Sequence, residues 1–358
     1  MDLEFRPDAA AVQAYWDRFW RGESRERPAL LASVPKSGRT VPPWPHIYNL
    51  PRRPLGPQID ALLAWAEAQE FLGDLLPGYQ ISFAAEHFAL LLGAEMRYSA
   101  KAGRDAETGW ILPCLDDYAT PIRFRPDCRW WETTVAITRA FRARADGRLI
   151  IYWSELSGGL DALAALRGPE RLVLDLIERP DDVKRALAQL DQAHDDVRAA
   201  LAAELDIPRW GSLTRHGMYA RGWTSVPQCD FSCMISAPMF REFGIASLVR
   251  ECALLDGASY HLDGPGAIRH LEALAEVPRL RLIQWQPGAG NAATADWTAL
   301  YDHIGRLGLG LWRVGHRRDL LDCWRRSTSP YMCFHVTDVK TRAEFEAFQA
   351  EVACTQRG

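Results

Sequence analysis

The sequence lacks the features that would place it in several large classes of protein. No stretch reaches the roughly 18 consecutive apolar residues of a membrane-spanning helix, and the opening MDLEFRPDAAAVQAYW carries acids where a secretory signal would carry a basic start. Lysine and arginine form no long run, and the formal net charge is −4, so the basic footprint of a nucleic-acid-binding protein is missing. We therefore expect a cytoplasmic protein that acts on a small molecule, with neither nucleic acid nor membrane as a partner.

Cysteine is also scarce, with eight residues in 358. They are scattered along the chain without the density of a disulfide scaffold. Only Cys229 and Cys233 are close together, and no second such pair accompanies them, as a structural zinc site would require. We expect reduced thiols, most of them buried.

What the chain does contain is enough apolar material for a sizeable core. Hydrophobic residues make up 48% of the sequence and charged residues 25%, as in ordinary globular proteins. The tryptophan count of 14 is high, and with 13 Phe and 10 Tyr it exceeds what a core of this size needs. Some of these rings are therefore expected to line a cavity.

Apolar runs alternate with amphipathic helical patterns, which predicts repeated βαβ units and a parallel sheet. The expected strands are 28–34, 149–153, 223–231, 259–262, 280–285, 309–314 and 331–336. The expected helices are 59–72, 158–178, 181–205, 238–254, 267–276, 295–306, 316–326 and 341–353. An eighth strand within 73–147 would close a single (β/α)8 TIM barrel of the α/β class. An open doubly wound sheet is the competing architecture, but no G-x-G-x-x-G follows the first strand to support it.

The barrel is expected to occupy residues 27–358, after an N-terminal helical extension over 1–26. In that extension Tyr15, Trp16, Phe19 and Trp20 recur on one face of a helix. Residues 40–58 contain six prolines, which disfavour both helix and central strand. We therefore expect an insertion or lid over about 40–130.

Polar side chains follow nearly every expected strand, at the end where barrel enzymes carry their catalytic groups. His261 and Asp263 are two residues apart, so the pleat of a strand points both to one side. The same spacing places Cys333 and His335 on one face of the last strand. Together these four side chains are candidate ligands of zinc or a comparable divalent ion. Alternatively, His261 and Asp263 bond each other and polarise the substrate without a metal.

Other strand ends supply further candidates. Glu155 and Asp230 could act as general acid or base where a cavity raises their pKa. Side chains at or beside strand ends are candidate substrate contacts: Trp153, Trp223, Gln284, Trp285, Gln286 and Trp312.

At these residues the chain resembles the uroporphyrinogen decarboxylase superfamily of (β/α)8 barrels, which also contains corrinoid-linked zinc methyltransferases. The likeness covers most of the chain, and its most specific part is the stretch YHLDG at 260–264. It also includes the KSGR loop at 36–39, QWQPG at 284–288 and the helix 341–348. The resemblance implies a substrate contact at Arg39 in the KSGR loop.

The methyltransferase pattern of this superfamily is His-x-Cys with a further Cys near the end of the last strand. Here Asp263 takes the place of the first Cys, and Thr337 rather than Cys333 falls at the last position. The arginine-rich and aspartate loops of the true decarboxylase are matched by a single loop arginine and by SFAAE at 82–86. The methyltransferase branch is therefore the closer one.

The leading functional hypothesis is an enzyme that moves a one-carbon group to or from a small thiol or a methylated amine or sulfonium, with possible zinc assistance at His261 and Asp263. One alternative is a decarboxylase or lyase of a carboxylated substrate that uses Glu155, Asp230 and His261 as proton carriers. A non-catalytic ligand-binding barrel is the third reading. Candidate partners are a corrinoid protein as methyl carrier and a second copy of the chain in a homodimer.

Overall fold

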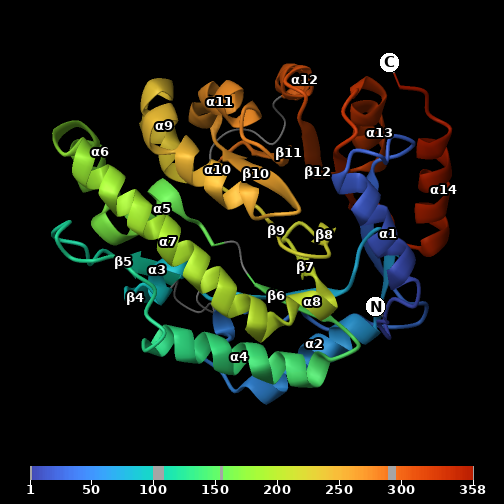
Figure 1. Cartoon of the computed structure of the whole chain (residues 1–358). Helices are drawn as coiled ribbons and strands as arrows, with labels where there is room; N and C mark the ends of the chain where they lie inside the picture. The colour runs from blue at the N-terminus through green and yellow to red at the C-terminus, as the bar shows by residue number, and fades with distance from the viewer. Residues whose placement is uncertain (1, 100–108, 154–155, 289–295, 358) are drawn as a thin grey trace.

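The computed structural model describes residues 2–99, 109–153, 156–288 and 296–357. A curled sheet lies at the centre of the molecule, with helices around it (Figure 1). Its strand order is β2-β1-β13-β12-β11-β10-β9. The bounds are β1 Ala29–Pro35, β2 Gln69–Gly73, β9 Thr224–Ser225, β10 Gly257–Asp263, β11 Leu280–Gln286, β12 Gly310–Gly315 and β13 Met332–Val336.

The sheet is parallel from β1 through β9, and only β2 runs antiparallel. Strand β1 pairs directly with β13, so the first and last strands of the chain are neighbours, with Leu31 opposite His335. Parallel pairing between the first and last strands of the chain is typical of a TIM-like fold.

Three shorter sheets complete the strands. They pair β3 (Gly78–Ile81) with β6 (Ile150–Trp153), β4 (Glu95–Tyr98) with β5 (Gly109–Leu112), and β7 (Ser212–Leu213) with β8 (Tyr219–Ala220). Among the described strands, none of these sheets is paired with the large one, so the structure is TIM-like without showing a closed barrel.

Helices follow the strands of the second half, as the alternating pattern predicts. The α-helices are α1 Ala9–Trp20, α2 Leu55–Glu67, α3 His87–Leu91, α4 Arg129–Ala145, α5 Gly159–Arg167, α6 Pro169–Glu178, α7 Pro180–Leu205, α8 Ile207–Trp210, α9 Ala237–Phe243, α10 Ile245–Ala253, α11 Leu271–Ala275, α12 Thr298–Arg306, α13 Arg317–Arg326 and α14 Arg342–Ala353. Short 3-10 helices are η1 Ile47–Asn49, η2 Asp230–Met234 and η3 Pro265–His270. In the described part of the chain, none of these helices is both long and apolar enough to cross a membrane.

The N-terminal helix α1 covers one end of the sheet with its aromatic face, as expected. Trp16 and Phe19 are fully buried, in a cluster that also contains Leu31, Leu282 and Cys333. The indole N–H of Trp16 donates to the carbonyl of Asp74 at 2.8 Å, which satisfies its one polar atom inside the core. Packed aromatic rings therefore cover this end of β1 and β13.

Several local expectations are wrong. The helix expected over 59–72 ends at Glu67, because 69–73 pairs with β1 instead. The strand expected over 223–231 is reduced to Thr224–Ser225, since η2 begins at Asp230. The helix expected over 158–178 is broken at Gly168, which has φ +91° and precedes a proline.

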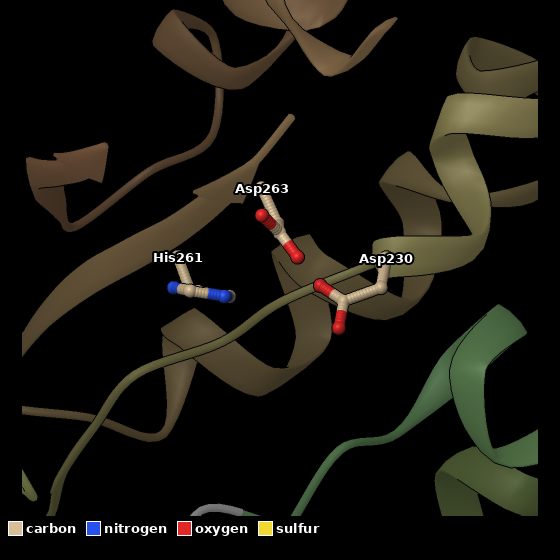
Figure 2. A group of neighbouring side chains, drawn as sticks. All are labelled: Asp230, His261 and Asp263. Atoms are coloured by element: carbon tan, nitrogen blue, oxygen red, sulfur yellow. The ribbon is translucent and has the colours of Figure 1, made fainter. Parts of the chain in front are cut away.

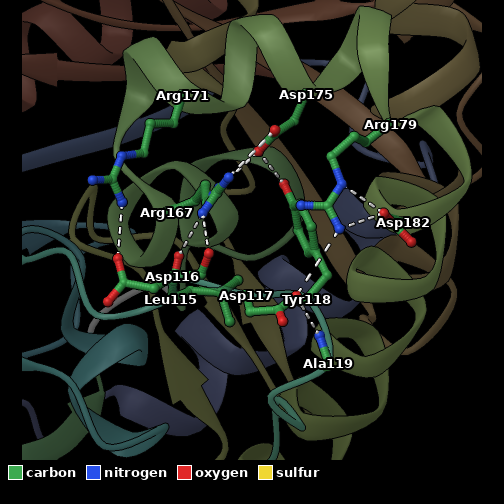
Figure 3. A network of polar contacts seen from close by, with 10 residues as sticks. All are labelled: Leu115, Asp116, Asp117, Tyr118, Ala119, Arg167, Arg171, Asp175, Arg179 and Asp182. Atoms are coloured by element: carbon green, nitrogen blue, oxygen red, sulfur yellow. Dashed lines mark hydrogen bonds and ion pairs between the residues drawn. The ribbon is translucent and has the colours of Figure 1, made fainter.

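Residues 40–130, expected to form an insertion or lid, contain α2, α3 and the strands β2 to β5. A network of arginines holds the stretch after β5 against α5 and α6 (Figure 3). Arg167 donates to the carbonyls of Leu115 at 3.1 Å and Asp116 at 2.7 Å, and it pairs with Asp175 at 2.7 Å. The phenol of Tyr118 donates to the same Asp175 carboxylate at 2.8 Å. Residues 115–118 are thus held against α5 and α6.

Candidate functional site

Three side chains converge near the C-terminal end of β10. His261 and Asp263 lie on β10 with the fully buried Leu262 between them, and Asp230 opens η2. One ligand atom of each residue lies within 4.8 Å of those of the other two. Figure 2 shows the imidazole and the two carboxylates pointing toward one another. The strand pleat thus brings the predicted pair together, and the turn after β9 adds Asp230.

The orientation of His261 is set by its neighbour on β11. Gln284 lies opposite His261 in the register, and its Oε1 is hydrogen-bonded to the imidazole Nδ1. The amide of Gln284 is itself oriented, because its Nε2 donates to the carbonyl of Trp285 at 3.1 Å. Since an amide oxygen only accepts, Nδ1 carries a proton, and in the neutral ring Nε2 then has a lone pair for a ligand.

Asp263 presents an acceptor that the described residues do not use. Its Oδ1 is buried and has no hydrogen-bond partner among them. Its backbone carbonyl accepts from the Sγ of Cys233 at 3.0 Å. A buried carboxylate oxygen without a partner costs free energy, which a bound cation would recover.

Asp230 is held in place by a carboxylate from α5. Asp161 is 8% exposed, and its two oxygens accept the backbone N–H groups of Asp230 and Phe231, each at 2.9 Å. Burial, reinforced by the charge of Asp230, raises the pKa of the Asp161 carboxyl to about 7. The sequence interpretation missed Asp161. An acid in the first turn of a helix is ordinarily a surface residue whose negative charge is stabilised by the helix dipole.

Two further carboxyl groups of the site have raised pKa values, chiefly because they are buried. Removal from water, followed by the nearby charge of Asp263, raises the pKa of Asp230, while His261 and Arg215 oppose that rise. Burial and Asp230 likewise raise the pKa of Glu86. Carboxyl groups with raised pKa values are typical of sites that bind cations or transfer protons.

The donor set suits a divalent metal ion. One imidazole nitrogen and two carboxylate oxygens are donors that zinc accepts, and they leave a further position for a substrate. In tetrahedral coordination, ligands about 2.0–2.2 Å from zinc lie roughly 3.3–3.6 Å apart. The three donor atoms lie within 4.8 Å of one another, so side-chain rotations would have to bring them closer around an ion.

The other two candidate ligands lie apart from this group. Cys333 is fully buried in the cluster around α1, where burial raises the pKa of its thiol. His335 lies on β13, and burial lowers its pKa. Among the described residues neither belongs to the converging group, in which Asp230 supplies the third ligand atom.

The remaining candidates are dispersed. Glu155 lies outside the described residues. Trp312 stacks on His216 with ring centroids 4.2 Å apart, and Trp285 packs against Trp297 at 4.9 Å. Trp153 and Trp223 line a separate small cavity of about 30 Å³. Arg39 and Gln286 are exposed, and Gln284 acts through His261.

A cavity of about 370 Å³ opens beside Asp230. Glu86, Asp161 and Asp230 line one part of it, and the rest is apolar. The apolar lining is Trp110, Ile111, Pro113, Ala164, Ala165, Pro169, Phe231 and Met234. The four tryptophans expected to line the pocket are absent from this wall, and Trp110, from the poorly patterned middle of the sequence, is present.

Comparison with known proteins supports the fold. No family model matches the chain, and no curated protein matches it. Solved structures do match, among them a methyltransferase from Methanosarcina mazei with a TM-score of 0.57 and 11% sequence identity. The match covers 95% of this chain and 97% of that one. This chain therefore shares, over nearly its whole length, the fold of a known methyltransferase.

Proposed function

We propose that this protein is a methyltransferase-like enzyme that moves a one-carbon group to or from a small thiol or a methylated amine or sulfonium. The observation that carries the proposal is the convergence of Asp230, His261 and Asp263 at the C-terminal end of the sheet. The shared fold with a methyltransferase supports it. We further propose that the strands form a complete (β/α)8 barrel and that a corrinoid protein is the methyl partner.

Asp230, His261 and Asp263 would hold a zinc ion. When bound, zinc lowers the pKa of a thiol and so supplies a nucleophilic thiolate near neutral pH. Gln284 keeps the Nε2 of His261 aimed at the site, and Asp161 keeps Asp230 there.

Direct methyl transfer from an ammonium or sulfonium to a thiol needs neither an oxidant nor a reductant. The sulfur electron pair of the thiolate forms a bond to the methyl carbon. The bond from that carbon to the donor nitrogen or sulfur breaks, and its electrons remain on the leaving atom. The thiol proton is lost beforehand, and Glu86, whose pKa is raised, is suited to hold it.

The test measures zinc content and methyl transfer on the same preparations. We expect about one zinc per chain after dialysis in wild type, and its loss in Asp263→Asn and His261→Ala. His335→Ala should keep its zinc, because His335 lies outside the converging group. Exposed Asp302→Asn is the matched control for loss of a carboxylate.

Methyl transfer is followed by ¹H NMR with trimethylsulfonium as donor and dithiothreitol as acceptor, with and without a corrinoid. We expect dimethyl sulfide and an S-methyl thioether from wild type, and neither from Asp263→Asn. Wild-type protein that holds no zinc and keeps full activity after exhaustive chelation would refute the metal-assisted mechanism.

A decarboxylase is the second candidate, favoured by the raised pKa values of Glu86, Asp161 and Asp230 beside His261. Such groups could protonate a carbanion after loss of carbon dioxide. Titration with porphyrinogens distinguishes the candidates, because the methyltransferase proposal predicts no binding. A non-catalytic barrel would gain support if alanine at His261 and Asp263 changed neither turnover nor ligand binding.

A further inference from the structure

The 370 Å³ cavity beside Asp230 has two chemically different parts. Three carboxyl groups, those of Glu86, Asp161 and Asp230, come from separate elements and line one part. Trp110 and Met234 contribute to the apolar part, where they are 56% and 52% exposed. A volume of this size suits a small organic molecule rather than a bare ion.

The carboxyl groups are not balanced by cations within the cavity. Neither lysine nor arginine is among the described residues that line it. Burial is the main cause of the raised pKa values of the three carboxyls, and repulsion from neighbouring carboxylates adds to it. Asp263 does not line the cavity, but one of its carboxylate oxygens lies within 4.8 Å of a ligand atom of Asp230 and adds to the negative charge near it. An occupant that brings positive charge would stabilise the ionised forms of the three lining carboxyls.

The segment that carries the apolar residues is anchored by strand pairing and by hydrogen bonds to its backbone. Trp110 and Ile111 lie on β5, which is paired with β4, and Pro113 follows directly. The arginine network of Figure 3 ties the next residues to α5 and α6, whose Ala164 and Pro169 face the same cavity. The backbone that carries Trp110 is thus anchored, and its exposed ring at the cavity is available to a cation.

We propose that this cavity binds a small organic cation, an ammonium or sulfonium carrying methyl groups, between the carboxyl groups of Glu86, Asp161 and Asp230 and the ring of Trp110. The inference rests on the proposed function, because Asp230 is common to the cavity and the converging group, and it names the substrate class. The charge of the cavity selects against an anionic substrate, and its apolar wall selects against a metal ion as the sole occupant.

Three probes of similar bulk separate charge from shape. Choline is a cation, 3,3-dimethyl-1-butanol is its neutral counterpart, and 3,3-dimethylbutyrate is an anion. We expect choline to bind the full-length protein about tenfold more tightly than the neutral alcohol in isothermal titration calorimetry, and the anion not to bind. Equal or tighter binding of the neutral alcohol, or no saturable binding of choline, would overturn the inference.

Two variants locate the binding. Glu86→Gln should weaken the binding of choline by about tenfold and leave the affinity for the neutral alcohol unchanged, because only a charge is removed. Trp110→Ala should also weaken the binding of choline. Trp44→Ala, at another exposed tryptophan, should leave it unchanged. Choline binding that is unaffected by both cavity variants would overturn the assignment to this cavity.

Zinc content measured on the same samples separates this inference from the proposed function. Preference for choline in a protein that holds no zinc would support the inference while refuting the metal-assisted mechanism. A zinc-loaded protein with no preference for choline would refute the inference alone.

Discussion

His87 provides a quantitative test of how burial controls stability in this fold. It lies fully buried on α3, with its ring centroid 4.0 Å from that of Phe83 and 4.5 Å from that of Trp153. Its Nδ1 accepts the backbone N–H of Phe83 at 3.3 Å, and its Nε2 is 3.3 Å from the hydroxyl oxygen of Thr134. Because Nδ1 accepts, the folded protein holds the neutral ring.

Burial lowers the pKa of His87 from 6.5 to about 3. As the pH falls below about 6.5, the unfolded chain binds a proton that the folded chain refuses, so stability is lost on the acid side. The loss continues until the pH approaches about 3, where the folded state also takes the proton. Between pH about 7.5 and about 5, this one residue removes about 2 kcal/mol of unfolding free energy.

The assay is urea denaturation followed by circular dichroism at these two pH values and constant ionic strength. His87→Gln keeps an acceptor at the site but does not titrate, so we expect its pH-dependent loss to be smaller than that of wild type by about 2 kcal/mol. Thr134→Val is the matched control, because it removes the hydrogen-bond partner without removing a titrating group and should lower stability equally at both pH values. An unchanged pH dependence in His87→Gln would refute the reasoning.

Two further predictions concern the site and its wall. Gln284→Leu removes the acceptor that orients His261, and we expect zinc affinity to fall by about 10–100-fold in competition with a chromophoric chelator; undiminished affinity would contradict this. Arg167→Ala leaves the buried carboxylate of Asp175 without its ion pair, so we expect a loss of about 3–5 kcal/mol in urea denaturation. Arg171→Ala breaks an exposed pair and should cost less than about 1 kcal/mol, so similar losses in the two variants would rule out this account.

Much of the second half of the fold follows from local sequence. The expected strand 280–285 is β11 within one residue, and the expected helix 341–353 is α14. Apolar runs bounded by capped amphipathic helices have few alternatives, so periodicity suffices there. The first half is different, because helix α4 is rich in arginine and aromatic residues and follows a proline-rich stretch that gives no regular period.

The candidate site shows the same division. His261 and Asp263 are two residues apart on one strand, so the pleat alone places them together. The sequence also singled out Asp230, but as a separate acid or base rather than as a third donor. It offered Cys333 and His335 instead. The pleat shows which residues share a face of a strand, but it does not show which of them lie near His261 in the folded protein.

The sequence by itself therefore determined the alternation of strands and helices, the aromatic face of α1 and the pairing of His261 with Asp263, because each depends on residues a few positions apart. Only the tertiary structure decided that Asp161 holds Asp230 across 69 positions and that Trp110 lines the same cavity as three carboxyl groups. Contacts between distant segments depend on how whole elements pack, and no local period records them.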